Sequence, residues 1–342
     1  MRRLFAAALA SIAVLLAGSA PALACAGLIG SNGAVNLGRT TTLAAYHEGV
    51  EHYITAFQFQ GGGGQFGTLI PLPGVPSSVE KGGAWTLQRL VRETEPQKFF
   101  LDTALAARSA GPVPAEVLLE KRIDALDITV LKGGSRAVAD WATDHGFRLS
   151  PDAPEMLEFY AKRSPIFLAA IFDGDAAAAR GQQLGDGTPV HITIPTPTPW
   201  VPLRILGLGK QPGDLIDADV YLLTDRAPAL LPRPHRGLDL LHSAAATDLL
   251  LSDLRSDEGM SWIPESAWLT KLRIDSTAGE LRYDLAIDAS GQGTPSRVAA
   301  GLDLPLATQA DPTVLPPAWA LIALAAALLA FPISMSLVKA RR

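Results

Sequence analysis

The sequence is almost without cysteine, because Cys25 is the only one among its 342 residues. An internal disulfide is therefore excluded, and the chain must fold on its hydrophobic core alone. Three further signatures are missing: a Gly-x-Ser-x-Gly nucleophile elbow, an internal repeat of fixed period, and a pair of histidines four residues apart. The sequence therefore contains no motif that identifies a catalytic residue. We expect neither a bound metal nor a cofactor.

Charge is missing from residues 318–338, which read AWALIALAAALLAFPISMSLV. As a helix this run is roughly 31 Å long at ~1.5 Å per residue, close to the ~30 Å hydrocarbon core of a bilayer. Trp319 suits the outer interface, and the basic Lys339, Arg341 and Arg342 end the chain and favour a cytoplasmic tail. The pattern predicts a single-pass membrane anchor. The alternative is a buried core helix.

The first residues, 1–24, carry two arginines, then an apolar run over 4–17, then the small-residue sequence Ala22-Leu23-Ala24. This is the pattern of a secretory signal peptide that is cleaved between Ala24 and Cys25. A lipidated Cys25 is the alternative, although Leu23 stands one place too late for a lipobox.

The remaining chain is acidic. Of the 29 Lys and Arg residues, two lie in the predicted signal peptide and three follow the predicted anchor. The region between them therefore has 24 basic residues and all 34 Asp and Glu, a net charge of −10. Such a surface repels nucleic acid, so we expect no nucleic-acid partner. The expected partner is the plasma membrane, through the anchor. A further partner, either an envelope protein or a ligand of unknown kind, could bind the domain on the outer side of the membrane.

The part between the two apolar ends is predicted to be an α+β domain richer in strands than in helices, formed by residues 25–289 and divisible into two lobes. The 31 glycines and 26 prolines of the whole sequence are spread along the chain, as expected for short elements joined by many turns. Residues 290–317 are predicted to be a stalk rich in Gly, Pro and Ala. Period-two or continuous apolar patterns predict strands at 39–46, 51–60, 66–70, 126–131, 166–172, 190–194, 201–206, 219–224, 269–274 and 281–287.

Helices are predicted at four places by their period and by their capping residues. They cover residues 85–93; 136–145 after the N-cap Ser135; 153–163 after the N-cap Asp152; and 244–254 after the N-cap Ser243.

The order of these segments resembles a bacterial family of secreted or membrane-tethered proteins, domain-of-unknown-function family 2330. This resemblance implies a shared fold and an exported location; it supplies no activity and no functional residue. The stretches that carry it are TTLAAYHEGVEHYITAFQFQ (41–60), TLIPLPGVP (68–76), WATDHGF (141–147), EMLEFYAKRSPIFLAAIF (155–172), VHITIPTPTPWVPLRI (190–205) and WLTKLRID (268–275).

Three short motifs could carry chemistry, and each departs from its pattern. His47 and His52, with Glu48 and Glu51 between them, are five residues apart across a predicted hairpin and not four apart on a helix. The run 173–175 begins like a calcium loop, but alanine and leucine stand at later ligand positions. Ser78 and Lys81 have Ser-x-x-Lys spacing without a Lys-Thr-Gly partner.

We therefore expect a single-pass surface protein that acts as a non-enzymatic binding or envelope-structural module. The alternative is an extracytoplasmic hydrolase whose site is assembled from distant residues. A Ser, a His and an Asp buried in one cleft would favour the hydrolase.

Overall fold

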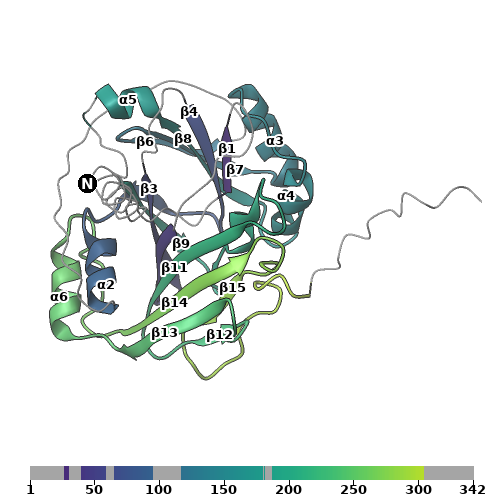
Figure 1. Ribbon diagram of the computed structural model, residues 1–342. Coiled ribbons are helices and arrows are strands. Elements are labelled where there is room, and N and C mark those ends of the chain that lie inside the picture. The colour runs from purple at the N-terminus through teal and green to yellow at the C-terminus, as the bar shows by residue number, and fades with distance from the viewer. Residues whose placement is uncertain are drawn as a thin grey trace, which may run out of the picture. The chain divides into compact units, whose positions relative to one another are not determined.

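The computed structural model describes residues 27–30, 40–58, 65–94, 117–179, 181 and 187–303. Their strands form three sheets (Figure 1). The largest, sheet A, has seven strands in the order β13-β14-β11-β2-β3-β9-β5. Strands β2 and β11 run parallel, and the other neighbours are antiparallel. The bounds are β2 Thr40–His47, β3 Val50–Gln58, β5 Ser78–Lys81, β9 Gly187–Pro195, β11 Leu215–Thr224, β13 Leu238–Ala245 and β14 Trp268–Thr277.

The remaining described strands form two antiparallel sheets. Sheet B has the order β1-β4-β8-β7-β6, with bounds Gly27–Gly30, Gln65–Pro71, Ile166–Asp173, Leu126–Lys132 and Val117–Ile123 respectively. The small sheet C has the order β10-β15-β12, with bounds Trp200–Val201, Leu285–Asp288 and Ala229–Leu231.

The described helices are short, and four of them cover the sheets. Helices α2 (Thr86–Thr94) and α6 (Asp248–Ser256) lie side by side, and α3 (Gly134–Asp144) packs on α4 (Ala153–Ala161). Helix α5 (Gly174–Ala179) follows β8, and a 3-10 helix, η1 (Arg204–Gly207), follows β10.

The buried side chains show that sheets and helices stack in four layers. Helices α2 and α6 share an apolar cluster with one face of sheet A, to which Leu43 and Ile54 contribute. The opposite face of sheet A, including Tyr53, packs against sheet B. Helices α3 and α4 cover the far face of sheet B. Each large apolar side chain that is fully buried stabilises the fold by ~1.5–3 kcal/mol.

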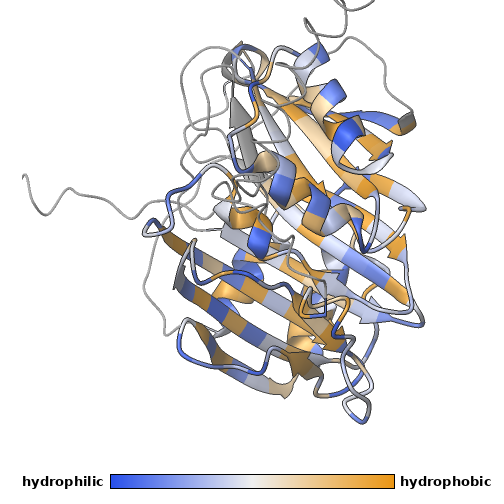
Figure 2. Ribbon diagram, turned by 90° about the vertical axis from the view of Figure 1, so that its right-hand side faces the viewer, coloured by the Kyte–Doolittle hydropathy of each residue, from blue (hydrophilic) through white to orange (hydrophobic). Residues whose placement is uncertain are grey.

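Strand β8 shows how a sequence pattern follows from these layers. Its residues from Ile166 to Phe172 are all buried, because sheet A covers one face of the strand and helices α3 and α4 cover the other. A strand buried on both faces needs no polar alternation, which explains the continuous apolar run. Figure 2 shows alternating hydrophilic and hydrophobic bands along several strands of the sheets. The predicted strand-rich α+β class is confirmed.

The predicted helix at 244–254 begins too early. Residues up to Ala245 pair with β14 as strand β13, and helix α6 begins at Asp248. Thr247 is its N-cap, because the Thr247 hydroxyl accepts a hydrogen bond of 3.1 Å from the amide of Leu250. Ser243 and Thr247 are both residues that favour caps. Ser243 pairs with Thr270 of β14 as part of strand β13, so Thr247 is the residue that caps the helix.

The predicted strand at 201–206 is mostly wrong. Only Trp200–Val201 pairs as β10, and the chain then turns into η1. The Asp284 carboxylate accepts hydrogen bonds from the amides of Leu203 and Arg204 at 2.7 and 2.9 Å. Amides that donate to this carboxylate cannot also donate to a neighbouring strand. The strand expected at 281–287 is similarly shortened to Leu285–Asp288.

The predicted cap at Ser135 is wrong, whereas Asp152 is the N-cap of α4 as predicted but does not cap it with its side chain. Gly133 is the N-cap of α3 and has a φ of 140°, which favours glycine. The Asp152 side chain makes no cap hydrogen bond and instead accepts from the Gly209 amide at 3.0 and 3.2 Å. A sequence window cannot reveal such a distant partner.

The folded part continues past the predicted boundary at residue 289. Ala299 and Ala300 are buried, and the Asp284 amide donates a hydrogen bond of 3.0 Å to the Ala300 carbonyl. Residues 290–303, which were assigned to the stalk, therefore pack on the domain. The predicted signal peptide and the predicted anchor lie outside the described residues, as does the rest of the predicted stalk. No described helix is both long and apolar enough to cross a membrane.

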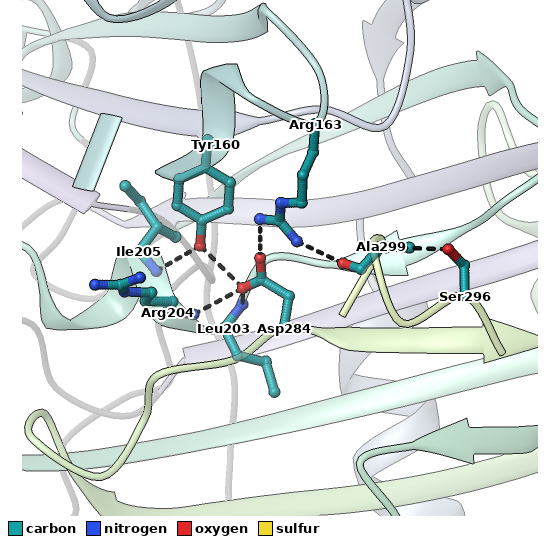
Figure 3. A network of polar contacts seen from close by, with 8 residues as sticks. All are labelled: Tyr160, Arg163, Leu203, Arg204, Ile205, Asp284, Ser296 and Ala299. Carbon is teal, nitrogen blue, oxygen red and sulfur yellow. Dashed lines mark hydrogen bonds and ion pairs between the residues drawn. The ribbon is translucent and has the colours of Figure 1, made fainter. Parts of the chain in front are cut away.

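A buried polar network joins four segments at the α4 end of the domain (Figure 3). Asp284 and Arg163 form an ion pair with exposed side-chain fractions of 0% and 2%. Asp284 also accepts a hydrogen bond of 2.9 Å from the Tyr160 hydroxyl, which in turn accepts one of 2.8 Å from the Ile205 amide. Arg163 donates to the Ala299 carbonyl. The network thus ties α4 and η1 to the segments around residues 284 and 299.

We expect Asp284→Asn to lower the free energy of unfolding by about 3–5 kcal/mol, because it leaves the buried Arg163 charge without its counter-ion. Chemical denaturation of the purified protein measures the change. The control is Asp303→Asn, since Asp303 pairs with Arg297 at side-chain exposures of 43% and 58%. This surface pair is worth only about 0–1 kcal/mol. Equal losses in the two variants would contradict the prediction.

Candidate functional site

Two histidines from different strands meet on the face of sheet A that also carries α2 and α6. His52 Nδ1 on β3 lies 2.8 Å from His191 Nε2 on β9. The strand register pairs His52 with Thr193 and His191 with Ile54, so the two rings are diagonal neighbours on one face. Sheet pairing therefore brings together two residues that are 139 positions apart.

Trp262, in the loop after α6, covers this pair. Its ring is nearly parallel to that of His52, with centroids 3.8 Å apart and an interplanar angle of 4°. Its centroid lies 5.1 Å from that of His191. The loop approaches β5 closely at Gly259, which has a φ of +77° and where a Cβ atom would lie 3.0 Å from the Lys81 carbonyl oxygen. A glycine is needed there so that the loop can hold Trp262 in place.

Two hydroxyl groups extend the cluster toward the edge strand β5. Thr193 Oγ1 lies 3.4 Å from His191 Nε2, and Ser78 Oγ donates a hydrogen bond of 3.1 Å to Thr193 Oγ1. We call His52, His191, Thr193, Ser78 and Trp262 the histidine cluster. It draws on three adjacent strands and one loop.

Both imidazoles of the histidine cluster are neutral at pH 7. Burial lowers the pKa of His52 to about 4, with a smaller contribution from His47. Burial, and then the neighbouring His52, lowers the pKa of His191 to about 4 as well. A neutral imidazole carries one N–H and one lone pair. One of the two facing nitrogens therefore donates and the other accepts.

The cluster does not form a nucleophile–base–acid relay. Such a relay uses both nitrogens of a histidine, one facing the nucleophile and one facing an orienting carboxylate. Thr193 and His52 contact the same nitrogen of His191. Within the described ranges, no histidine is hydrogen-bonded to both a hydroxyl nucleophile and a carboxylate.

The structure separates the two histidines of the predicted hairpin motif. His47 and His52 lie on the same face of the hairpin, since Ala45 pairs with His52 and His47 pairs with Val50. Each nevertheless has its own partner, because His47 Nδ1 lies 2.6 Å from Asp225 Oδ1. No group of three or more His, Cys, Asp or Glu that could hold a metal occurs in the part of the chain that the structure describes.

The other two motifs have structural roles. Ser78 and Lys81 lie three positions apart on β5, so their side chains point to opposite faces, and Lys81 Nζ pairs with Asp124 at 2.7 Å. Asp173 Oδ1 accepts a hydrogen bond of 2.9 Å from the Ala176 amide at the start of α5. Of these motif residues, Ser78 alone belongs to the histidine cluster.

A separate titratable group, Glu51, is fully buried on the opposite face of β3. Burial raises the pKa of its carboxyl to about 8, opposed by a hydrogen bond of 3.3 Å from the Trp200 amide. Within the described structure, no hydrogen-bond partner reaches its Oε1 atom. Glu51 is therefore protonated at neutral pH.

We expect Glu51→Gln to stabilise the protein in mildly alkaline buffer. The unfolded chain ionises Glu51 near pH 4.5 and the folded chain near pH 8, so the wild type loses stability as the pH rises through this interval. The loss is of the order of 5 kcal/mol at full extent. Thermal unfolding at pH 5 and pH 8.5 measures this effect. The melting temperature of the variant relative to that of the wild type should be higher at pH 8.5 than at pH 5.

Glu48→Gln is the matched control, because Glu48 is on the same hairpin with its side chain 83% exposed. We expect Glu48→Gln to leave the pH dependence of the wild type unchanged. A pH profile of Glu51→Gln parallel to that of the wild type would contradict the assignment.

These observations define a strand-rich α+β domain with three sheets and one histidine cluster. The chain belongs to the family described as an uncharacterized protein conserved in bacteria (DUF2330), whose sequence profile matches residues 19–229, more than half of the chain. This confirms the resemblance found in the sequence. No curated protein sequence matches the chain.

Among solved structures, distant likeness is found to baculovirus P35. The crystal structure of baculovirus P35 gives a TM-score of 0.39 at 9% identity, covering 73% of this chain and 96% of that one. A mutated P35 after caspase cleavage gives 0.40 at 7% identity, covering 74% and 100% of the two chains. P35 in complex with caspase-8 gives 0.38 at 8% identity, covering 74% and 96%. No property of P35 is transferred to this chain at such values.

Proposed function

We propose that the protein is a single-pass surface protein whose domain binds a ligand or an envelope protein at the outer face of the plasma membrane, without catalysis. A signal peptide over residues 1–24 directs export. A helix over residues 318–338 holds the domain at the membrane, with Trp319 at the outer interface and the basic residues 339–342 in the cytoplasm. The sequence pattern at the two ends supports this topology.

The observation that favours binding over hydrolysis is the way in which the histidines are engaged. His47 pairs with the Asp225 carboxylate, and among the described residues no hydroxyl is hydrogen-bonded to its other nitrogen, which lies 3.8 Å from Glu48 Oε1. His191 contacts a hydroxyl but has another histidine in place of a carboxylate. A hydrolase of the serine type needs both contacts on one imidazole. The histidine cluster is therefore better suited to holding a ligand than to activating a nucleophile.

The topology is tested by fusing a reporter after Arg342 and by adding protease to intact spheroplasts. We expect a reporter that is active only in the cytoplasm to work, and the protease to remove the domain, because the basic tail stays inside. The control is a chain that ends at Pro317, which should be released in soluble form. Protection of the domain in intact spheroplasts would contradict the topology.

A further inference from the structure

We propose that the turn formed by residues 296–303 contacts the lipid bilayer, with the side chains of Val298 and Leu302 inserted among the headgroups of the outer leaflet. We call residues 296–303 the exit turn, because they are the last described residues before the predicted anchor. Val298 and Leu302 are 49% and 40% exposed. The inference rests on the proposed function, since it takes the predicted anchor as the tether, and it adds a lipid surface as a partner of the domain itself.

The backbone of the exit turn is fixed by its own hydrogen bonds. The Gly301 amide donates to the Val298 carbonyl at 2.9 Å, and the Leu302 amide donates to the Arg297 carbonyl at 3.0 Å. These are the two bonds of a Schellman motif, in which one residue takes a positive φ. Gly301 is that residue, with a φ of 72°. The two apolar side chains are therefore carried by an ordered turn, and little conformational entropy is lost when they insert.

The inner side of the exit turn packs on helix α4. Ala299 and Ala300 are buried, and Arg163 donates a hydrogen bond to the Ala299 carbonyl (Figure 3). Gly301 lies so close to α4 that a Cβ atom there would clash with the ring of Phe159. The small residues thus occupy the side of the turn that faces the domain, and the larger Val298 and Leu302 occupy the side that faces solvent.

The position of the exit turn in the chain indicates what covers these side chains. Residues 304–317 separate it from the first residue of the predicted anchor, Ala318. A segment of this length spans at most about 50 Å, even when fully extended. Short tethers of this kind give an effective concentration of about a millimolar. Weak insertion of two apolar side chains is then sufficient to keep the exit turn on the bilayer.

The charges of the exit turn are compatible with a lipid surface. The domain as a whole is acidic and is repelled by anionic headgroups. Within the exit turn, however, Arg297 Nε pairs with the Asp303 carboxylate at 2.8 and 3.0 Å. This pair carries no net charge, so the turn approaches a zwitterionic headgroup layer without repulsion. Apolar side chains bordered by charged groups are typical of segments that lie in the membrane interface.

The test uses the full-length protein in phosphatidylcholine vesicles that contain a nitroxide-labelled lipid. Cys25, the only cysteine, is first replaced in Cys25→Ser, and Leu302→Cys is then labelled with an environment-sensitive fluorophore. We expect the emission to shift to shorter wavelength and to be quenched by nitroxide near the headgroups. Adding Val298→Ser should lower the equilibrium constant for insertion by about 3–10-fold, because about half of a valine side chain no longer leaves water.

Leu249→Cys, labelled in the same way, is the matched control. Leu249 is 68% exposed on helix α6, which covers sheet A, whereas the exit turn packs on α4 in the opposite outer layer. Its label should keep the emission of a fluorophore in water and should not be quenched. Circular dichroism should show the same fold for all variants. If Val298→Ser does not fold, the comparison between the two labelled positions decides the matter.

An unquenched label at Leu302→Cys, or equal quenching at Leu302→Cys and Leu249→Cys, would overturn the inference. In the first case the exit turn stays in water, and in the second the domain has no preferred face toward the bilayer. An unquenched label on a domain that protease removes from intact spheroplasts would refute the lipid contact and keep the proposed function. A quenched label on a domain that is protected inside spheroplasts would keep the lipid contact and refute the proposed topology.

Discussion

The buried charge of Asp284 is the constraint on which the α4 side of the domain depends. An ionised carboxylate without solvent is stable only when its oxygens are occupied, and here Arg163, Tyr160 and two backbone amides occupy them. Arg163 is stabilised in turn by the rings of Phe159 and Trp200, at 4.4 and 4.6 Å from its guanidinium carbon. Because these partners come from segments far apart in the sequence, none of the segments can move without exposing an unpaired charge.

The same constraint explains where the regular elements stop. Two amides that a longer β10 would use are directed to Asp284, so the strand ends at Val201 and the chain turns. Beyond β15, the turn at 296–301 is held by Arg163 through the Ala299 carbonyl. Sheet C is therefore small because the polar network uses the neighbouring backbone. The same contact keeps the chain beyond residue 289 packed on the domain.

The sequence predicts the elements whose environment is encoded in their own residues. Strand β8 is found because burial on both faces demands a continuous apolar run, and β3 because its two faces are covered by different layers. The start of helix α6 is misplaced because pairing with β14 extends strand β13, and Asp152 stands at the N-cap of α4 without a capping side-chain bond because its carboxylate accepts from the distant Gly209 amide. Strand β5, only four residues long, has too few positions to show a period. The errors thus lie where long-range contacts override local preference.

The histidine cluster is the clearest case of this limit. Alternation along β3 places His52 on the same face as Ile54, and that much can be read from the strand alone. Nothing in the sequence shows that β9 is the next strand, that its register sets His191 diagonally opposite, or that Trp262 returns over both rings. Burial lowers the pKa of both imidazoles, so the pair on these two strands carries no positive charge at neutral pH. A histidine pair of this kind arises from sheet topology, so in this fold the order of the strands, and not a local motif, determines which residues can act together.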